Sequence, residues 1–381
     1  MKVAQTGLSN SSVSVPMRAS PLSVDWVKLA LGLVLAGLTV YAFAVQKVEN
    51  DLTCFSWLVG HWSNVSNYSH GPLIPLIASF LLYWTLSHRA PAGTNWQPYW
   101  NAMIGGGVAL GIWFVASAIN KEWEAIGYYY AMRLLPLTLV WQVWALRDHL
   151  RGQQSPLVGA GITLVVLAMG IYYIGVKAGQ PRVVVVAGVL LLYGIALTWR
   201  GRDVFRLVFF PISFLILMVP LNFLDGAIGF PLRMFVAKAA TAILNLIGIE
   251  AVQRGSGIIS AVFRFDVADP CSGIRSLMAL TTVTAAYAYV TQHSQWKRWF
   301  LFLCAMPLAV LGNLARVVSI AVFAQVYGQD LATKVYHDWS GFILFPVALA
   351  AMVGIGVLLN FDYRRFVQHL LQPPSRGRIH E

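Results

Sequence analysis

Three residues in the second half of the chain, Cys271, Arg316 and His337, have side chains that together could carry out acyl transfer. Cys271 follows Pro270 and comes directly before an apolar stretch that predicts a helix. The positive end of a helix dipole favours a thiolate and can lower the pKa of a thiol from about 8.5 into a range of about 3.5–7.5. We therefore predict that Cys271 is a nucleophile that attacks a carbonyl carbon.

Two neighbours of Cys271 in the sequence are predicted to support it. Arg275 lies one helical turn further on and would add a full positive charge, and Ser272 follows the thiol directly. Two other readings of Cys271 remain open: a small buried side chain, or one half of a disulfide with Cys54, which lies in the first outer loop. Cys304 lies among apolar residues and predicts core packing.

Arg316 and Asn313 lie three residues apart, on one face of a predicted membrane-spanning helix. An arginine at such a depth costs about 2.5–3.5 kcal/mol, so it needs a partner or a water-filled pocket. As a fixed cation with a planar donor fork, Arg316 could stabilise the oxyanion that forms when a carbonyl is attacked. The alternative is a structural arginine that is paired with a carbonyl or extends outward to the membrane surface. A structural role is also what we expect for Arg133 in an earlier span.

His337 begins the segment His337–Gly341 at the outer end of the last predicted span. An imidazole there could take the thiol proton and return it to a leaving amine near neutral pH. Asp338 is adjacent and is a supporting candidate, whereas a surface histidine beside the interfacial Trp339 is the alternative. His70 enters the second span at the same face; it could line the same pocket, or simply belong to a turn that starts a helix.

The composition predicts a membrane protein. Of the 381 residues, 58% are hydrophobic and 11% are charged, whereas soluble domains carry about 25% charged residues. The long apolar runs of this chain are typical of membrane-spanning helices and not of the short alternating strands of a membrane β-barrel. The fold class that follows is an all-α polytopic membrane protein with about ten transmembrane helices, predicted at residues 26–45, 71–87, 98–119, 125–146, 156–176, 183–199, 205–220, 273–291, 298–325 and 341–361.

The charged residues predict the orientation. Fifteen Lys and Arg residues fall in the segments that an inside N-terminus makes cytoplasmic, whereas the short outer loops hold only Lys47, Lys121, Lys177, Arg182 and Lys334. The positive-inside rule therefore favours both termini inside. The same rule accounts for the net charge of +12, and because no basic patch with interleaved aromatic residues stands out, we expect no nucleic acid partner.

We predict a single transmembrane domain over residues 23–361, with a disordered cytoplasmic tail at 1–22 and a cytoplasmic tail at 362–381. Residues 221–272 are an outer-face insertion directly before Cys271. Its first half predicts an amphipathic helix over 231–247, with Lys238, Thr241 and Asn245 on one side. Its second half predicts a small β-hairpin with strands at 249–253 and 258–267.

Four segments of the chain resemble motifs of the exosortase/archaeosortase family of multi-pass membrane enzymes. These are the cysteine motif at Pro270–Leu277, the arginine motif at Gly312–Arg316, the histidine motif at His337–Gly341 and an element at Tyr68–Pro72. They occur in the expected order over about residues 60–360. The chain stops about 20 residues after its last predicted span, so we expect it to lack the C-terminal soluble domain that some relatives carry.

The resemblance implies a cysteine protease or transpeptidase with the triad Cys271, Arg316 and His337. Its implied partners are membrane-anchored proteins with a C-terminal sorting signal (a motif such as Pro-Glu-Pro, a transmembrane helix and a basic cluster), together with an unidentified acceptor nucleophile and the lipid bilayer. The resemblance implies a bacterial inner-membrane enzyme whose active site faces the periplasm. No cofactor is expected, and the three cysteines show no spacing typical of a metal site.

Two other function classes stay open at this point. One is a transporter in which Arg133 and Arg316 line a pathway, although we find no inverted repeat. The other is a non-catalytic component of exopolysaccharide export. Replacement of Cys271 by Ala or Ser distinguishes the three classes, because an enzyme would leave its substrate uncleaved whereas a transporter or an export component should tolerate the change.

Overall fold

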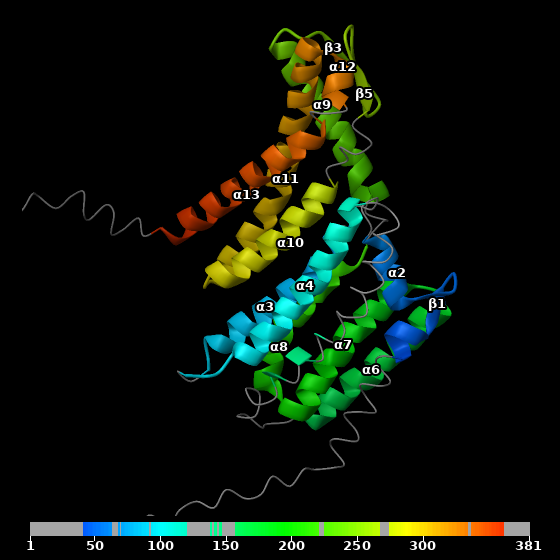
Figure 1. Cartoon of the computed structure of the whole chain (residues 1–381), viewed down its shortest axis with the longest axis vertical. Coiled ribbons are helices and arrows are strands. Elements are labelled where there is room, and N and C mark those ends of the chain that lie inside the picture. The colour runs from blue at the N-terminus through cyan, green and yellow to red at the C-terminus, as the bar shows by residue number, and fades with distance from the viewer. Residues whose placement is uncertain are drawn as a thin grey trace, which may run out of the picture.

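The computed structural model describes residues 41–62, 68, 70–90, 93–119, 138, 141–142, 145–146, 157–220, 225–266, 274–333 and 337–361. The predicted tails, most of the first predicted span and most of the fourth, which includes Arg133, lie outside these residues. Long helices dominate the described chain (Figure 1). They are α3 (Leu73–Ser87), α4 (Gln97–Ile119), α6 (Val158–Lys177), α7 (Pro181–Arg200), α8 (Arg202–Phe214), α9 (Phe230–Leu246), α10 (Ile274–Thr291), α11 (Gln295–Tyr327) and α13 (His337–Asn360).

These helices confirm the predicted fold class, an all-α polytopic membrane protein. Five stretches within the described residues are long and apolar enough to cross a membrane: Val158–Lys177, Pro181–Arg200, Gly226–Leu246, Gln295–Tyr327 and Ile343–Asn360. The helix α3 is apolar but shorter. Each coincides with a span predicted from the sequence except Gly226–Leu246, which comprises the π-helical turn η3 (Asp225–Gly229) and α9.

Two of the three polar residues predicted on one side of α9 bond the backbone. Of the three polar positions expected on one side, Lys238 is exposed. The hydroxyl of Thr241 donates to the carbonyl of Ala237 in its own helix, at 2.8 Å. The amide of Asn245 bonds both backbone groups of Ala251, at 2.9 and 3.0 Å, and so fixes the start of the following strand. Together with the preceding π-helical turn, α9 is long and apolar enough to cross a membrane.

A small sheet follows α9 and corrects the predicted hairpin. It has three antiparallel strands in the order β3 (Ala251–Arg254), β4 (Gly257–Ser260) and β5 (Arg264–Asp266). The single strand predicted at 258–267 is wrong, because the chain reverses after Ser260, whose N–H donates to the carbonyl of Phe263 at 2.8 Å. Ile258 and Phe263 are both buried, yet five residues along a continuous strand would put them on opposite faces. The reversal lets both side chains enter one core.

That core joins the sheet and α9 to the far half of α11. Val236, Ala240 and Leu244 of α9 pack with Ile258 and Phe263 against residues 317–324 of α11. At 33 residues, α11 is about 50 Å long, longer than a hydrocarbon core of about 30 Å. Figure 1 shows α9, the sheet and the short α12 (Gln329–Leu331) gathered at one end of the molecule, beside the end of α11.

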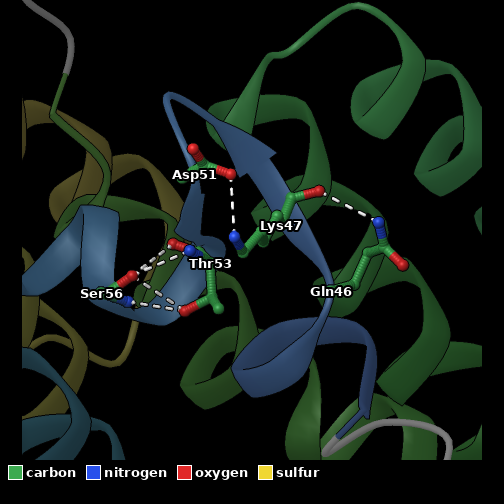
Figure 2. Close-up of polar contacts among 5 residues, drawn as sticks. All are labelled: Gln46, Lys47, Asp51, Thr53 and Ser56. Atoms are coloured by element: carbon green, nitrogen blue, oxygen red, sulfur yellow. Dashed lines mark hydrogen bonds and ion pairs between the residues drawn. The ribbon is translucent and has the colours of Figure 1, made fainter.

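At the N-terminal side of the described chain, a π-helical turn η1 (Tyr41–Val45) leads into a two-stranded hairpin, β1 (Lys47–Glu49) and β2 (Leu52–Thr53). Figure 2 shows Lys47 paired with Asp51 across this hairpin at 2.8 Å, where Asp51 has a positive φ of 62°. Thr53 then caps α2 (Cys54–His61) through a capping box: its hydroxyl accepts from the N–H of Ser56, and Ser56 Oγ accepts from the N–H of Thr53. These local bonds fix the direction in which α2 leaves the hairpin.

Glycines allow α6 and α7 to pack closely. The backbone of Thr198 in α7 lies against Gly161, and Val165 of α6 lies against Gly194. Small residues at such contacts are typical of helices that associate in a membrane, where backbone contact takes over from the hydrophobic effect. The connection between the two helices is three residues long, so they are antiparallel neighbours.

The close contact at Gly161 gives a testable prediction. A Cβ at this position would lie 2.6 Å from the backbone nitrogen of Thr198, and no rotamer change can relieve a clash with backbone. We expect Gly161→Ala to lower stability by about 1–3 kcal/mol, measured as the thermal unfolding midpoint of the purified protein in detergent. The control is Gly159→Ala, two residues earlier on the same helix, where a Cβ meets nothing within 4 Å. Equal midpoints for the two variants would contradict the packing argument.

Candidate functional site

The three helices α10, α11 and α13 pack against one another and bring two helix starts to the same part of α11. The first described residue of α10 is Ile274, three residues after Cys271, and α13 begins at His337. Only residues 292–294 separate α10 from α11, so the two helices run in opposite directions. The start of α10 therefore faces the later half of α11, which carries Arg316.

Arg316 is held by the first turn of α13. Its Nε donates to Oγ of Ser340 at 3.0 Å, and Ser340 is fully buried. Ser340 lies three residues after His337, on the same face of the helix. The bond fixes the plane of the guanidinium and ties the start of α13 to α11.

A small cavity of about 50 Å³ lies where the three helices meet. Its polar side chains are Ser276 from α10 and the pair Asn313 and Arg316 from α11, and Asn313 is buried. Apolar residues close the remainder: Leu280, Ala309, Gly312, Leu344, Phe345 and Ala348. This volume has room for a few water molecules and not for a peptide segment.

The structure places the predicted site residues as follows. Arg316 and Asn313 line it. Arg275 belongs to the first turn of α10, and His337 and Asp338 belong to the first turn of α13. Cys271 and Ser272 lie outside the described residues, so their role remains a prediction.

Two serines that the sequence did not single out contribute to the site. Ser276 lines the cavity, and Ser340 bonds Arg316. Both lie within the cysteine and histidine motifs, five residues after Cys271 and three after His337. The signal that could have revealed them is the need of an arginine within a membrane-spanning helix for an oxygen partner from a neighbouring helix.

His70 lies in a turn that starts α3. The N–H of Gly71 donates to the backbone carbonyl of Tyr68 at 2.8 Å, and the N–H of Leu73 donates to the backbone carbonyl of His70 at 3.0 Å. The indole of Trp62 packs directly on Gly71, where any side chain would clash with the indole. The indole Nε1 donates to the backbone carbonyl of Met218 at 3.1 Å. The turn that was one reading of this motif is therefore present.

The imidazole of His70 is half-buried, and its Nδ1 has no hydrogen-bond partner among the residues that the structure describes. Burial lowers the pKa of His70 to about 4, so the ring is neutral at pH 7. His70 is not part of the lining of the 50 Å³ cavity. Tyr68, two residues earlier, packs in the cluster that Met278 of α10 also contacts.

The two described cysteines are unsuited to nucleophilic attack. Cys54 is a free, fully buried thiol whose Sγ donates to the carbonyl of Pro181 at 3.6 Å. Burial raises the pKa of Cys54 to about 12. Because it is a free thiol, Cys54 is no disulfide partner for Cys271. Cys304 is free within α11. Among the described residues, no group of three His, Cys, Asp or Glu side chains could hold a metal ion.

Comparison with known proteins gives one family match. A family described as transmembrane exosortase matches residues 123–354, which is more than half of the chain and contains the cysteine, arginine and histidine motifs. No solved structure matches.

Two curated proteins are also similar to parts of the chain. A Na⁺/H⁺ antiporter, NhaA 3 of Salinispora tropica, is 24% identical over 282 residues, 69% of this chain and 42% of that protein. ATP synthase subunit a of Syntrophobacter fumaroxidans is 24% identical over 104 residues, 24% of this chain and 42% of that protein. The chain thus spans about two fifths of the length of each of these relatives.

The bond between Arg316 and Ser340 gives a second prediction. Ser340→Ala leaves a guanidinium donor without its buried acceptor, so we expect a loss of about 1–3 kcal/mol in stability, read from thermal unfolding. Ser319→Ala is the matched control, because the hydroxyl of Ser319 only donates to the carbonyl of Arg316 in its own helix, at 2.8 Å. A loss for the control as large as that for Ser340→Ala would show that the bond between the helices is not what stabilises this region.

Proposed function

The chain belongs to the transmembrane exosortase family, and from this premise we propose that it is a membrane cysteine peptidase or transpeptidase that cleaves C-terminal sorting signals of exported proteins. The observation that carries the proposal is the hydrogen bond from Arg316 to Ser340 beside a polar cavity at which α10, α11 and α13 meet. It supports a site built from the starts of two helices and one fixed arginine.

In the proposed mechanism, His337 takes the proton of the Cys271 thiol, and the resulting thiolate attacks the carbonyl carbon of the scissile peptide bond. The tetrahedral oxyanion is stabilised by the guanidinium of Arg316, whose orientation Ser340 fixes. The C–N bond then breaks, His337 donates a proton to the leaving amine, and a thioester remains on Cys271. Water or an acceptor amine next attacks the thioester and releases the new C-terminus and the thiol.

The surroundings of the thiol support its ionisation. Residue 271 is three positions before the first described residue of α10, whose N–H groups point toward the helix start. Arg275 in the first turn adds a charge of the same sign. Ser272 and Asp338 are the remaining polar candidates for orienting the substrate or the imidazole. This acyl transfer requires neither a metal nor an organic cofactor.

The proposed substrates are membrane-anchored proteins that carry a short motif, a transmembrane helix and a basic cluster. Such an anchor holds the scissile bond at a fixed height in the same bilayer, which raises its effective concentration at the enzyme. We propose that the protein lies in the bacterial inner membrane with this site facing the periplasm. The chemistry of the thioester does not specify which nucleophile accepts the new C-terminus.

Transport is the second candidate, because part of the chain is similar to a Na⁺/H⁺ antiporter. Carriers of protons or cations use carboxylates within their membrane spans. All fifteen Asp and Glu residues of this chain lie in loops or tails or within a turn of the end of an apolar stretch. A route for a cation through the interior therefore lacks carboxylate ligands, and the enzyme reading is favoured.

The central test is the thiol itself. Cys271→Ala should abolish cleavage of a co-expressed reporter that ends in a Pro-Glu-Pro motif, a transmembrane helix and a basic cluster. Mass spectrometry of the reporter C-terminus distinguishes the intact from the processed protein. Cys304→Ala is the control and should process the reporter normally. Normal processing by Cys271→Ala would contradict an enzymatic role and favour a transporter or a component of polysaccharide export.

Arg316→Lys separates charge from geometry. Lysine keeps the positive charge but loses the planar donor fork that Ser340 orients, so we expect processing of the same reporter to fall by about 10²–10³-fold. Arg202→Lys, an exposed change at the start of α8, should leave processing unchanged. Full activity of Arg316→Lys would show that the positive charge is sufficient and that the planar donor fork oriented by Ser340 is not needed.

A further inference from the structure

A second and much larger cavity lies at the other end of α10 and α11. It measures about 790 Å³ and is bounded by the end of α3, the helix α8, the end of α10 and the start of α11. Three arginines from three different helical segments line it: Arg89 just after α3, Arg206 in α8 and Arg298 in α11. The catalytic proposal uses none of these residues.

The three arginines are available to an anion. Arg89 and Arg206 are exposed, and within the described part of the chain none of the three forms an ion pair. Arg298 is half-buried and fixed in place. Its Nε donates to the backbone carbonyl of Gln292 at 2.7 Å, and its guanidinium lies 4.9 Å from the centre of the Tyr289 ring. Three like charges around one cavity repel one another, and a bound anion would remove that repulsion.

Apart from the arginines, most of the cavity wall is apolar and aromatic. Phe210 stacks on Tyr289 with ring centres 4.1 Å apart, and the Tyr289 hydroxyl pairs with Thr85 at 2.8 Å. Trp299 is exposed at the rim, where tryptophan is typical of a membrane interface. Phe209, Ile216, Leu217 and Phe302 complete the apolar surface. A cationic rim over an apolar wall is complementary to a lipid with an anionic head.

The position along α11 fits a headgroup. Arg298 and Arg316 are 18 residues apart on one helix, which corresponds to about 27 Å. A hydrocarbon core is about 30 Å thick, so the distance between the two arginines nearly equals the thickness of the core. The positive-inside rule assigns the end that carries Arg89, Arg206 and Arg298 to the cytoplasmic leaflet.

We propose that this cavity binds an anionic phospholipid of the cytoplasmic leaflet. Arg89, Arg206 and Arg298 bind its phosphate, and an acyl chain lies along Phe209, Phe210 and Leu217. Basic pockets between helices on this side of a membrane are known to bind anionic headgroups. The bound lipid would join four helices, two of which continue to the cavity at Arg316.

The test uses the full-length protein, purified in a neutral detergent and titrated with dioleoylphosphatidylglycerol. Thermal unfolding and native mass spectrometry report stabilisation and the bound lipid. We expect phosphatidylglycerol to bind and stabilise, and dioleoylphosphatidylcholine to bind at least tenfold more weakly. In the double variant Arg89→Gln/Arg206→Gln, the affinity for phosphatidylglycerol should fall at least tenfold. Arg202→Gln, an exposed arginine of α8 outside the cavity, should bind as the unaltered protein does.

A second variant tests the acyl-chain part without changing any charge. Ile216→Trp fills the apolar part of the cavity and should weaken phosphatidylglycerol binding at least threefold while the protein remains folded. Inorganic phosphate alone at millimolar concentration should not stabilise the protein. Equal binding of the two lipids, unchanged binding by the double variant or by Ile216→Trp, or full stabilisation by inorganic phosphate would each overturn the proposal.

Discussion

The position of one half-buried guanidinium constrains how the second half of the chain can pack. Arg316 belongs to a helix long and apolar enough to span a membrane, where a charged side chain is costly unless neighbouring elements supply oxygen partners. Ser340 of α13 supplies one such partner, and Ser276 of α10 lies on the same cavity. The cation therefore requires the starts of two other helices beside it, and these are the helix starts that the cysteine and histidine motifs adjoin.

The helix α11 links the two ends of the molecule. Near its start, Arg298 bonds carbonyls at the end of α10, and about 27 Å further on Arg316 bonds Ser340. Beyond Arg316, residues 317–324 pack against α9 and the sheet. Since one continuous helix, which contains Pro307, carries all three sets of contacts, a change in packing at one end can alter the contacts at the other. This gives the lipid cavity a physical route to the candidate site.

The sequence predicted the helices well because their signal is long and redundant. The apolar runs at 156–176 and 183–199 correspond to α6 and α7 within two residues at each end. It predicted the strand at 258–267 wrongly, because alternation within a few residues cannot reveal a reversal that depends on which side chains α9 and α11 bury. Ser276 and Ser340 were missed for a related reason: a serine has no signal of its own until the arginine that it faces is known.

The size of the cavity at Arg316 limits what can determine specificity under the proposed function. A space of about 50 Å³ accommodates a carbonyl oxygen or a water molecule but excludes a peptide segment. Side chains of the sorting signal must therefore be recognised outside this cavity, near the starts of α10 and α13. The choice between hydrolysis and transfer would then depend on which nucleophile reaches the thioester from outside, because Arg316, oriented by Ser340, would stabilise the same oxyanion in both reactions.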